Sequence, residues 1–307
     1  YRTLTAVDSV IVVIDVAKGV EAQTEKLVEV CRMRNTPIIV FINKLDREGK
    51  DAFDLLDEIE SKLGLNICPL SWPIGMGQRF QGVYNIWEKQ LKLYTEVNKQ
   101  KIADSVKIED VEDPKVAEMV GSEAAEELVE ELGLLQGVYD DFDRDSYLKG
   151  ELSPVFFGSA LNNFGVQELL DCFVEIAPPP QAKDANGTLV KPTEDFFSGF
   201  VFKIHANMDP KHRDRLAFMK IVSGTFERNK NYKHTRLGKS MKFSSPTAFM
   251  ASKKSIVDQA FPGDIIGLHD TGNFRIGDSV SGGPELEFKG IPSFSPEHFR
   301  FVNNADP

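Results

Sequence analysis

Apolar runs without polar interruption mark the first half of the chain. Ile38–Ile42 is five apolar residues long, opened by Pro37 and closed by Asn43. A run of this kind, rich in β-branched residues, indicates a strand buried on both faces, as in a parallel sheet. Val10–Ile14 repeats the pattern, and Glu21–Arg34, which lies between the two runs, carries apolar residues at helical spacing. The order strand, helix, strand predicts a βαβ unit with a right-handed crossover.

Further periodic segments extend this α/β pattern. An amphipathic stripe predicts a helix over Asp51–Leu63, and a second one follows the apolar strand Pro154–Phe157. The other elements expected in this half are a short strand at Asn66–Leu70, a strand or hairpin over Phe80–Tyr94, an acidic helix over Asp113–Leu135 and a helix over Val166–Ile176. The acidic helix has no histidine nearby, so its carboxylates indicate a solvated face rather than a metal site.

The pattern changes after the prolines that end at Pro180. A polar stretch with a turn at Asn186-Gly187 follows, and it predicts an interdomain linker over residues 181–194. Beyond it, short alternating strands separated by glycines indicate a small antiparallel β-barrel. The strands are expected at Gly199–Ile204, Leu216–Ser223, Thr247–Met250 and Ile265–Leu268. The predicted organisation is thus an α/β domain over 1–180, the linker, and a barrel domain over 195–307 whose last residues, from Ile291, lead out.

A polar tetrapeptide, Asn43-Lys44-Leu45-Asp46, follows the strand Ile38–Ile42, where ligands of parallel sheets bind. The carboxylate of Asp46 can accept hydrogen bonds from guanine N1–H and the exocyclic N2 amine together, whereas adenine offers an acceptor at N1 and no such amine. Such charge-assisted bidentate pairs are strong. Asn43 can tie the loop to its neighbours or reach the base edge, and Lys44 can lay its alkyl stem along the base plane.

Ser159-Ala160-Leu161 occupies a matching place, in the turn that follows the strand Pro154–Phe157. A tight turn there can aim the backbone N–H of Ala160 at guanine O6, which is an acceptor, whereas adenine has an amine at that position. The small side chain of Ala160 lets the backbone approach the base. The tripeptide alone carries little information, and its position in a strand-to-helix turn gives it weight.

Composition limits the remaining classes. Hydrophobic and charged contents of 41% and 27% are those of a soluble globular protein, and no apolar run reaches the roughly 20 residues of a membrane span. Three scattered cysteines without a CxxC pair favour a reduced, cytoplasmic setting without structural zinc. The net charge of −11 argues against general nucleic-acid binding, such as to DNA.

One basic loop stands out against this acidic background. Lys211, Arg213 and Arg215 are candidates for contact with ribosomal RNA phosphate, with an exposed hairpin loop as the plainer interpretation. The same basic residues argue against a metal site at the nearby His205, Asp209 and His212, because they would repel a cation. No metal site and no catalytic triad is predicted.

Three segments resemble the later half of a translational GTPase G domain, and the resemblance extends over nearly the whole chain. They are AVDSVIVVIDVAKGVEAQTEKL, FINKLDR and PVFFGSALNNFGVQELLD. The separation of 113 residues between Asp46 and Ser159 (159 − 46) is longer than in small GTPases and implies an insertion within Arg47–Ser153. Two further segments, WPIG at 72–75 and GFVFKIHANMDPKHRDRLAFMKIVSG at 199–224, look most like the termination branch of the family in bacteria.

The resemblance implies a cytoplasmic, ribosome-associated GTPase that helps codon-specific release factors leave after termination. It implies GTP or GDP with magnesium in the intact protein, and guanine recognition by Asn43, Lys44, Asp46, Ser159, Ala160 and Leu161. The sequence contains neither GxxxxGK[ST] nor DxxGH. We therefore expect the phosphate-binding and catalytic elements before Tyr1 and a third domain after Pro307, with no GTP hydrolysis and no tight nucleotide binding by these 307 residues. A translocation GTPase similar to elongation factor G and an interaction module without nucleotide remain the alternatives.

Overall fold

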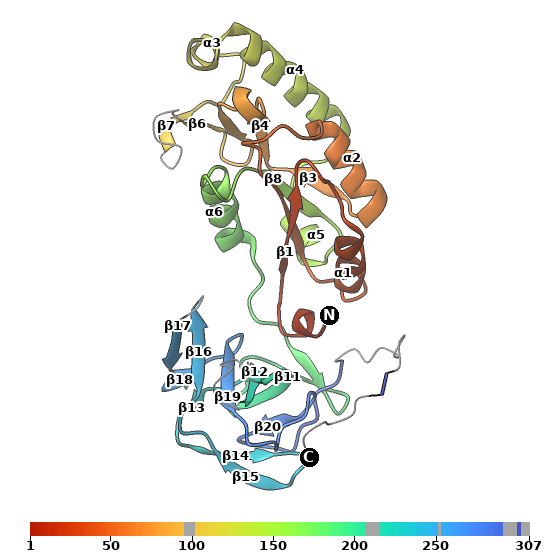
Figure 1. The fold of residues 1–307 in the computed structure, drawn as a ribbon, viewed down its shortest axis with the longest axis vertical. Helices are drawn as coiled ribbons and strands as arrows, with labels where there is room; N and C mark the ends of the chain where they lie inside the picture. The colour runs from red at the N-terminus through yellow and green to blue at the C-terminus, as the bar shows by residue number, and fades with distance from the viewer. Residues whose placement is uncertain (95–101, 207–214, 251–252, 291–299, 302–307) are drawn as a thin grey trace. The chain divides into compact units, whose positions relative to one another are not determined.

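The computed structural model describes residues 1–94, 102–206, 215–250, 253–290 and 300–301 (Figure 1). The chain divides into two compact units. One comprises Asp8–Pro179, and the other comprises Tyr1–Val7 together with Pro180–Pro307. Among the described residues, no helix combines the length and the apolar character needed to cross a membrane.

A four-stranded parallel sheet organises the unit Asp8–Pro179. Its strand order is β1 (Val10–Asp15), β2 (Ile38–Asn43), β8 (Ser153–Phe157) and β3 (Ile67–Pro69), and every neighbouring pair is parallel. All residues of β2 up to Ile42 are buried, as expected for a strand covered on both faces. The predicted parallel α/β sheet is thereby confirmed.

Helices cover both faces of this sheet. Figure 1 shows α6 (Val166–Ile176) on one side and α1 (Ala22–Arg32) and α2 (Ala52–Leu63) on the other. Helix α2 begins after Asp51, whose carboxylate accepts a hydrogen bond from Phe53 N at 2.9 Å, and it ends at Gly64, which has a left-handed φ of 60°. A short helix, α5 (Arg144–Leu148), precedes β8.

A second, antiparallel sheet is inserted between β3 and β8. It comprises β4 (Ser71–Ile74), β5 (Gly82–Asn85), β6 (Gln90–Tyr94) and β7 (Ile102–Lys107), with a short 3-10 segment, η2 (Gly77–Arg79), after β4. The hairpin predicted over Phe80–Tyr94 is confirmed as β5–β6. Strand β4 contains Pro73, which is tolerated because β4 is an edge strand and Pro needs no ladder partner there.

The acidic helix predicted over Asp113–Leu135 is two helices. They are α3 (Pro114–Val120) and α4 (Ser122–Val138), separated by Gly121 with a φ of 90°, which no regular helix adopts. Because α2 and β3 belong to the parallel-sheet layers, the added structure begins at β4, and it lies within Arg47–Ser153 as predicted.

The other unit is built on an eight-stranded antiparallel sheet, which confirms the predicted β-rich, barrel-like second domain. The order is β15 (Lys239–Lys242), β14 (Asn231–His234), β20 (Ser279–Ser281), β11 (Ser198–Ala206), β12 (Arg215–Ser223), β19 (Ile265–His269), β16 (Thr247–Met250) and β17 (Lys253–Ile256). A separate pair, β13 (Phe226–Glu227) and β18 (Gln259–Ala260), accompanies it. Buried aromatic residues, among them Phe197, Phe226 and Tyr232, fill its core.

The stretch predicted as a linker, 181–194, contains a hairpin. Strands β9 (Lys183–Ala185) and β10 (Thr188–Val190) pair across the predicted turn at Asn186-Gly187, where both residues have a positive φ. Ala185 and Val190 are buried in one apolar cluster with Ala6, which follows the 3-10 segment η1 (Arg2–Thr5). Burial of these side chains, together with a bridge between Ala185 and Phe288 and a hydrogen bond from Asn186 N to Glu287 O at 3.2 Å, orders this polar stretch. The predicted lead-out from Ile291 lies outside the described residues, apart from Arg300 and Phe301.

Candidate functional site

The carboxyl ends of three parallel strands lie at one edge of the sheet. Asp15 at the end of β1 is opposite Asn43 at the end of β2, and Ile42 is opposite Phe157 at the end of β8. The loops that follow β2 and β8 are joined by the backbone, because Leu45 N donates to Gly158 O at 3.1 Å. The two candidate segments are therefore neighbours in space.

Asn43 links the two segments directly. Its side-chain Oδ1 accepts hydrogen bonds from Ala160 N and from Lys44 N, both at 2.9 Å. Of the two roles left open for Asn43, the structure shows the tie between neighbouring loops. The N–H of Ala160 therefore has a protein partner, and a ligand carbonyl at this position would share that N–H with Asn43 or replace it.

Lys44 is held by a residue that the sequence analysis missed. Its Nζ lies 2.5 Å from Asp15 Oδ2, while Asp15 Oδ1 accepts from Ala17 N at 2.9 Å and Lys18 N at 3.3 Å. The hydrogen bond from Lys44 is the largest influence on the Asp15 carboxyl and lowers its pKa below the usual value. A carboxylate at the end of the adjacent buried strand was the signal that could have identified Asp15.

Asp46 carries an unsatisfied polar atom. Its Oδ1 is buried and has no hydrogen-bond partner within the described parts of the chain. The preceding Leu45 is fully buried, with its N bound to Gly158 O and its O accepting from Gly77 N at 2.9 Å, so the backbone that carries Asp46 is fixed. A buried carboxylate oxygen without a partner is costly and is typical of a site completed by a ligand.

The loop after β8 is a tight turn that needs glycine at Gly158 and Gly165, where the backbone approaches other backbone atoms closely. Ser159 is buried and exchanges two 2.9 Å backbone hydrogen bonds with Phe164. A Cβ on Gly158 would lie 2.1 Å from Phe164 O, and a Cβ on Gly165 would lie 2.0 Å from Phe157 O. The loop therefore exposes Ala160 and Leu161, and the Leu161 side chain is 75% exposed.

The basic loop of the second unit is only partly described. Lys211 and Arg213 lie outside the described residues, so their proposed contact with RNA stays a prediction. Arg215 is engaged within the chain: its Nε lies 2.9 Å from Asp270 Oδ2, and its Nη2 donates to Phe274 O at 2.9 Å. In the segments that the structure describes, no group of three or more His, Cys, Asp or Glu side chains could hold a metal ion.

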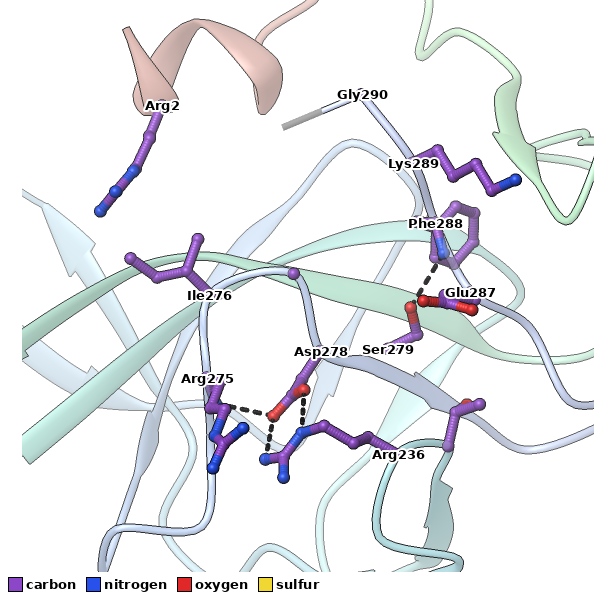
Figure 2. A pocket seen from close by; sticks show the side chains of 12 residues that line it. Arg2, Arg236, Arg275, Ile276, Asp278, Ser279, Glu287, Phe288, Lys289 and Gly290 are labelled. Carbon is purple, nitrogen blue, oxygen red and sulfur yellow. Dashed lines mark hydrogen bonds and ion pairs between the residues drawn. The ribbon is translucent and has the colours of Figure 1, made fainter. Parts of the chain in front are cut away.

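The same unit contains an open cavity of about 810 Å³ with an ordered ion pair at its wall. Figure 2 shows the guanidinium of Arg236 against the carboxylate of Asp278, with hydrogen bonds of 2.6 and 2.8 Å. Asp278 also accepts from Arg275 N at 2.7 Å. Burial raises the pKa of Asp278, but the hydrogen bonds from Arg236 and Arg275 N and the neighbouring charges of His234 and Arg236 lower it, and the resulting pKa lies below its usual value. The pair fixes the loop that leads into β20.

A parallel sheet with polar loops gathered at its carboxyl edge defines an α/β domain of the nucleotide-binding class. The family model for the elongation factor Tu GTP binding domain matches residues 1–179, and the model for elongation factor G domain 2 matches residues 196–283. The chain therefore belongs to the translational GTPase family. In this family the intact protein uses GTP and GDP with magnesium and interacts with the ribosome.

Proposed function

We propose that the loops after β2 and β8 form the guanine-recognition part of a GTP site. The Asp46 carboxylate accepts from the N1–H and N2 amine of guanine, and the Ala160 N–H donates to O6. Asn43 and Lys44 hold these groups in place, while Ser159 and Leu161 frame the second loop. The observation that carries the proposal is the buried Asp46 Oδ1, which has no hydrogen-bond partner among the described residues and lies in the first of two loops that are hydrogen-bonded to each other.

These residues bind and orient the base, and no catalytic role is assigned to any of them. In the intact protein, the nucleotide and magnesium supply phosphoryl transfer to water, a reaction that depends mostly on positioning and charge neutralisation. Because the purine is held at both of its hydrogen-bonding edges, its orientation is fixed, and so is the direction in which the ribose and phosphates extend from the base. Adenine is rejected because its N1 acceptor would face the Asp46 carboxylate and leave it unpaired.

We infer a role in translation termination, with codon-specific release factors and the ribosome as partners. The segments WPIG at 72–75 and ANMDPKHRDR at 206–215 support this role, because they look like bacterial peptide chain release factor three. The alternative, a translocation GTPase similar to elongation factor G, shares the plan, but we expect another sequence at 206–215. Release of a labelled codon-specific release factor from termination complexes, set against movement of transfer RNA in a translocation assay, separates the two roles.

Replacement of Asp46 by Asn tests the base contact in the intact protein. An amide donor suits the 2-oxo group of xanthine, so Asp46→Asn is expected to weaken GDP binding about tenfold to a hundredfold and to strengthen binding of xanthosine diphosphate. Asp57→Asn, which changes an exposed carboxylate in α2, is the matched control. An unchanged preference for GDP in Asp46→Asn would remove Asp46 from this role.

A fluorescent-GDP titration of residues 1–307 addresses the alternative of an interaction module without nucleotide. Because the sequence contains no GxxxxGK[ST] phosphate loop, we expect negligible binding by these residues and tight binding by the intact protein. Absence of GDP binding by the intact protein would favour the interaction module. Micromolar or tighter binding by residues 1–307 would contradict the requirement for a separate phosphate loop.

A further inference from the structure

The inserted antiparallel sheet reaches both candidate loops. After β4, the backbone of Gly77 donates to Leu45 O at 2.9 Å, next to Asp46. A Cβ on Gly77 would lie 2.2 Å from the carboxylate of Glu48, so the Glu48 side chain lies against the backbone of Gly77. The insertion is thus attached to the loop after β2.

Its strand β6 holds the loop after β8 through Tyr94. The Tyr94 hydroxyl accepts a hydrogen bond from Gly165 N at 2.9 Å, and the centroids of the Tyr94 and Phe164 rings lie 4.3 Å apart. The Phe80 ring stacks on both, with centroid distances of 6.0 Å to Tyr94 and 5.4 Å to Phe164. Phe164 exchanges its backbone hydrogen bonds with Ser159, the residue before Ala160. A continuous set of contacts therefore runs from β6 to the Ala160 amide.

A buried ion pair fixes the same strand against α6. Lys92 Nζ lies 3.0 Å from Glu168 Oε1, and the side chains are 8% and 0% exposed. Glu168 belongs to the first turn of α6, which follows Gly165 directly. Burying two charges is costly unless they are paired closely, so this contact strongly constrains how β6 lies against the helix.

We propose that Tyr94, with the Lys92–Glu168 pair, positions the Ala160 amide for recognition of the purine O6. This inference rests on the proposed guanine site and extends it to residues of the insertion that do not touch the base. Tyr94 acts by holding Gly165 and Phe164, which bound the loop that presents Ala160. The inserted sheet thereby becomes a determinant of guanine affinity, and its displacement weakens that affinity.

Tyr94→Phe tests the contact, because it removes the hydroxyl and keeps the ring. The matched control is Tyr84→Phe in the neighbouring strand β5, where the Tyr84 hydroxyl donates to Ile108 O at 3.0 Å, away from both loops. In residues 1–307, we expect faster amide hydrogen exchange at Gly165 and Ala160 in Tyr94→Phe and no change there in Tyr84→Phe. Unchanged exchange at both amides in Tyr94→Phe would overturn the positioning role.

The intact protein gives a readout that general destabilisation would not produce. Tyr94→Phe is expected to weaken GDP about three- to tenfold, and to weaken 6-thio-GDP, whose sulfur is a poorer acceptor, less than twofold. Tyr84→Phe should leave both affinities unchanged. Equal losses for GDP and 6-thio-GDP would show that Tyr94 is merely structural. Failure of the wild type to bind GDP would refute the guanine site itself, while the exchange experiment would still report on the contact.

Discussion

The Lys92–Glu168 pair allows a quantitative test of how strongly the insertion is fixed. Both side chains are almost fully buried at 3.0 Å, so removal of Lys92 leaves the Glu168 carboxylate uncompensated, whereas removal of Glu168 leaves Lys92 the longer contact with Glu88 Oε2 at 3.8 Å. Such a loss costs about 3–5 kcal/mol, a large part of the 5–15 kcal/mol that stabilises a typical domain. We therefore expect Lys92→Met to destabilise the unit Asp8–Pro179 by about 3–5 kcal/mol, and Glu168→Gln to act in the same direction.

The chain provides a selective assay for this unit. Its two tryptophans, Trp72 and Trp87, both lie within Asp8–Pro179, so tryptophan fluorescence during urea unfolding reports on this unit alone. With a slope of about 2 kcal/mol per molar urea, the expected loss lowers the midpoint by about 1.5–2.5 M. Lys18→Met is the control, because its 3.3 Å pair with Glu21 is exposed and worth about 0.5 kcal/mol or less.

The double variant Lys92→Met/Glu168→Gln completes the cycle. Because neither charge is left unpaired, its loss should be smaller than the sum of the two single losses. A single-variant loss below about 1 kcal/mol, or strict additivity of the two, would show that the pair does not constrain β6 as inferred.

Two further perturbations test the loop after β8 and the ion pair of the second unit. Gly158→Ala is expected to destabilise Asp8–Pro179 by about 1–3 kcal/mol, because its Cβ would meet Phe164 O, whereas Gly133→Ala in α4 meets no atom within 4 Å and should stabilise by about 0.5–1 kcal/mol. Tryptophan-monitored urea unfolding measures both, and a neutral Gly158→Ala would contradict the close approach. The lowered pKa of Asp278 means that its stabilising effect is present above the unfolded-state pKa of about 3.9 and is lost as the pH falls through the folded value. Arg236→Met removes the hydrogen bonds and the charge that lower this pKa and leaves the contacts from Arg275 N and from His234 Nε2 at 3.1 Å, so the folded pKa moves up and Asp278 stabilises the fold less at neutral pH. Less stability is then left to lose in acid, so the decrease in stability from neutral to acid pH, followed by the amide signals around Ser279, should be smaller than in the wild type; an equally steep decrease would refute this.

Local patterns in the sequence determined the elements and the fold class. The unbroken apolar run of β2 predicted a strand covered on both faces, and the amphipathic stripe predicted α6 to the residue, Val166–Ile176. These predictions succeed because the spacing of apolar residues within one helix or strand shows which of its faces are buried. The tetrapeptide after β2 and the turn after β8 also fell at the strand ends where they were expected, while their role in guanine recognition stays a prediction.

Only the tertiary structure decided which distant residues meet. The hydrogen bond from Ala160 N to Asn43 Oδ1 joins positions 117 residues apart, and Tyr94, which accepts from Gly165 N, has no local signature. Asp15 has a local signal at the end of β1, but only the structure shows that it holds Lys44. The hairpin within 181–194 likewise depends on burial of Ala185 and Val190 in a core built largely from later strands. These features depend on packing of the whole chain. A short polar segment can adopt several conformations of similar free energy, and the contacts with residues distant in sequence stabilise one of them.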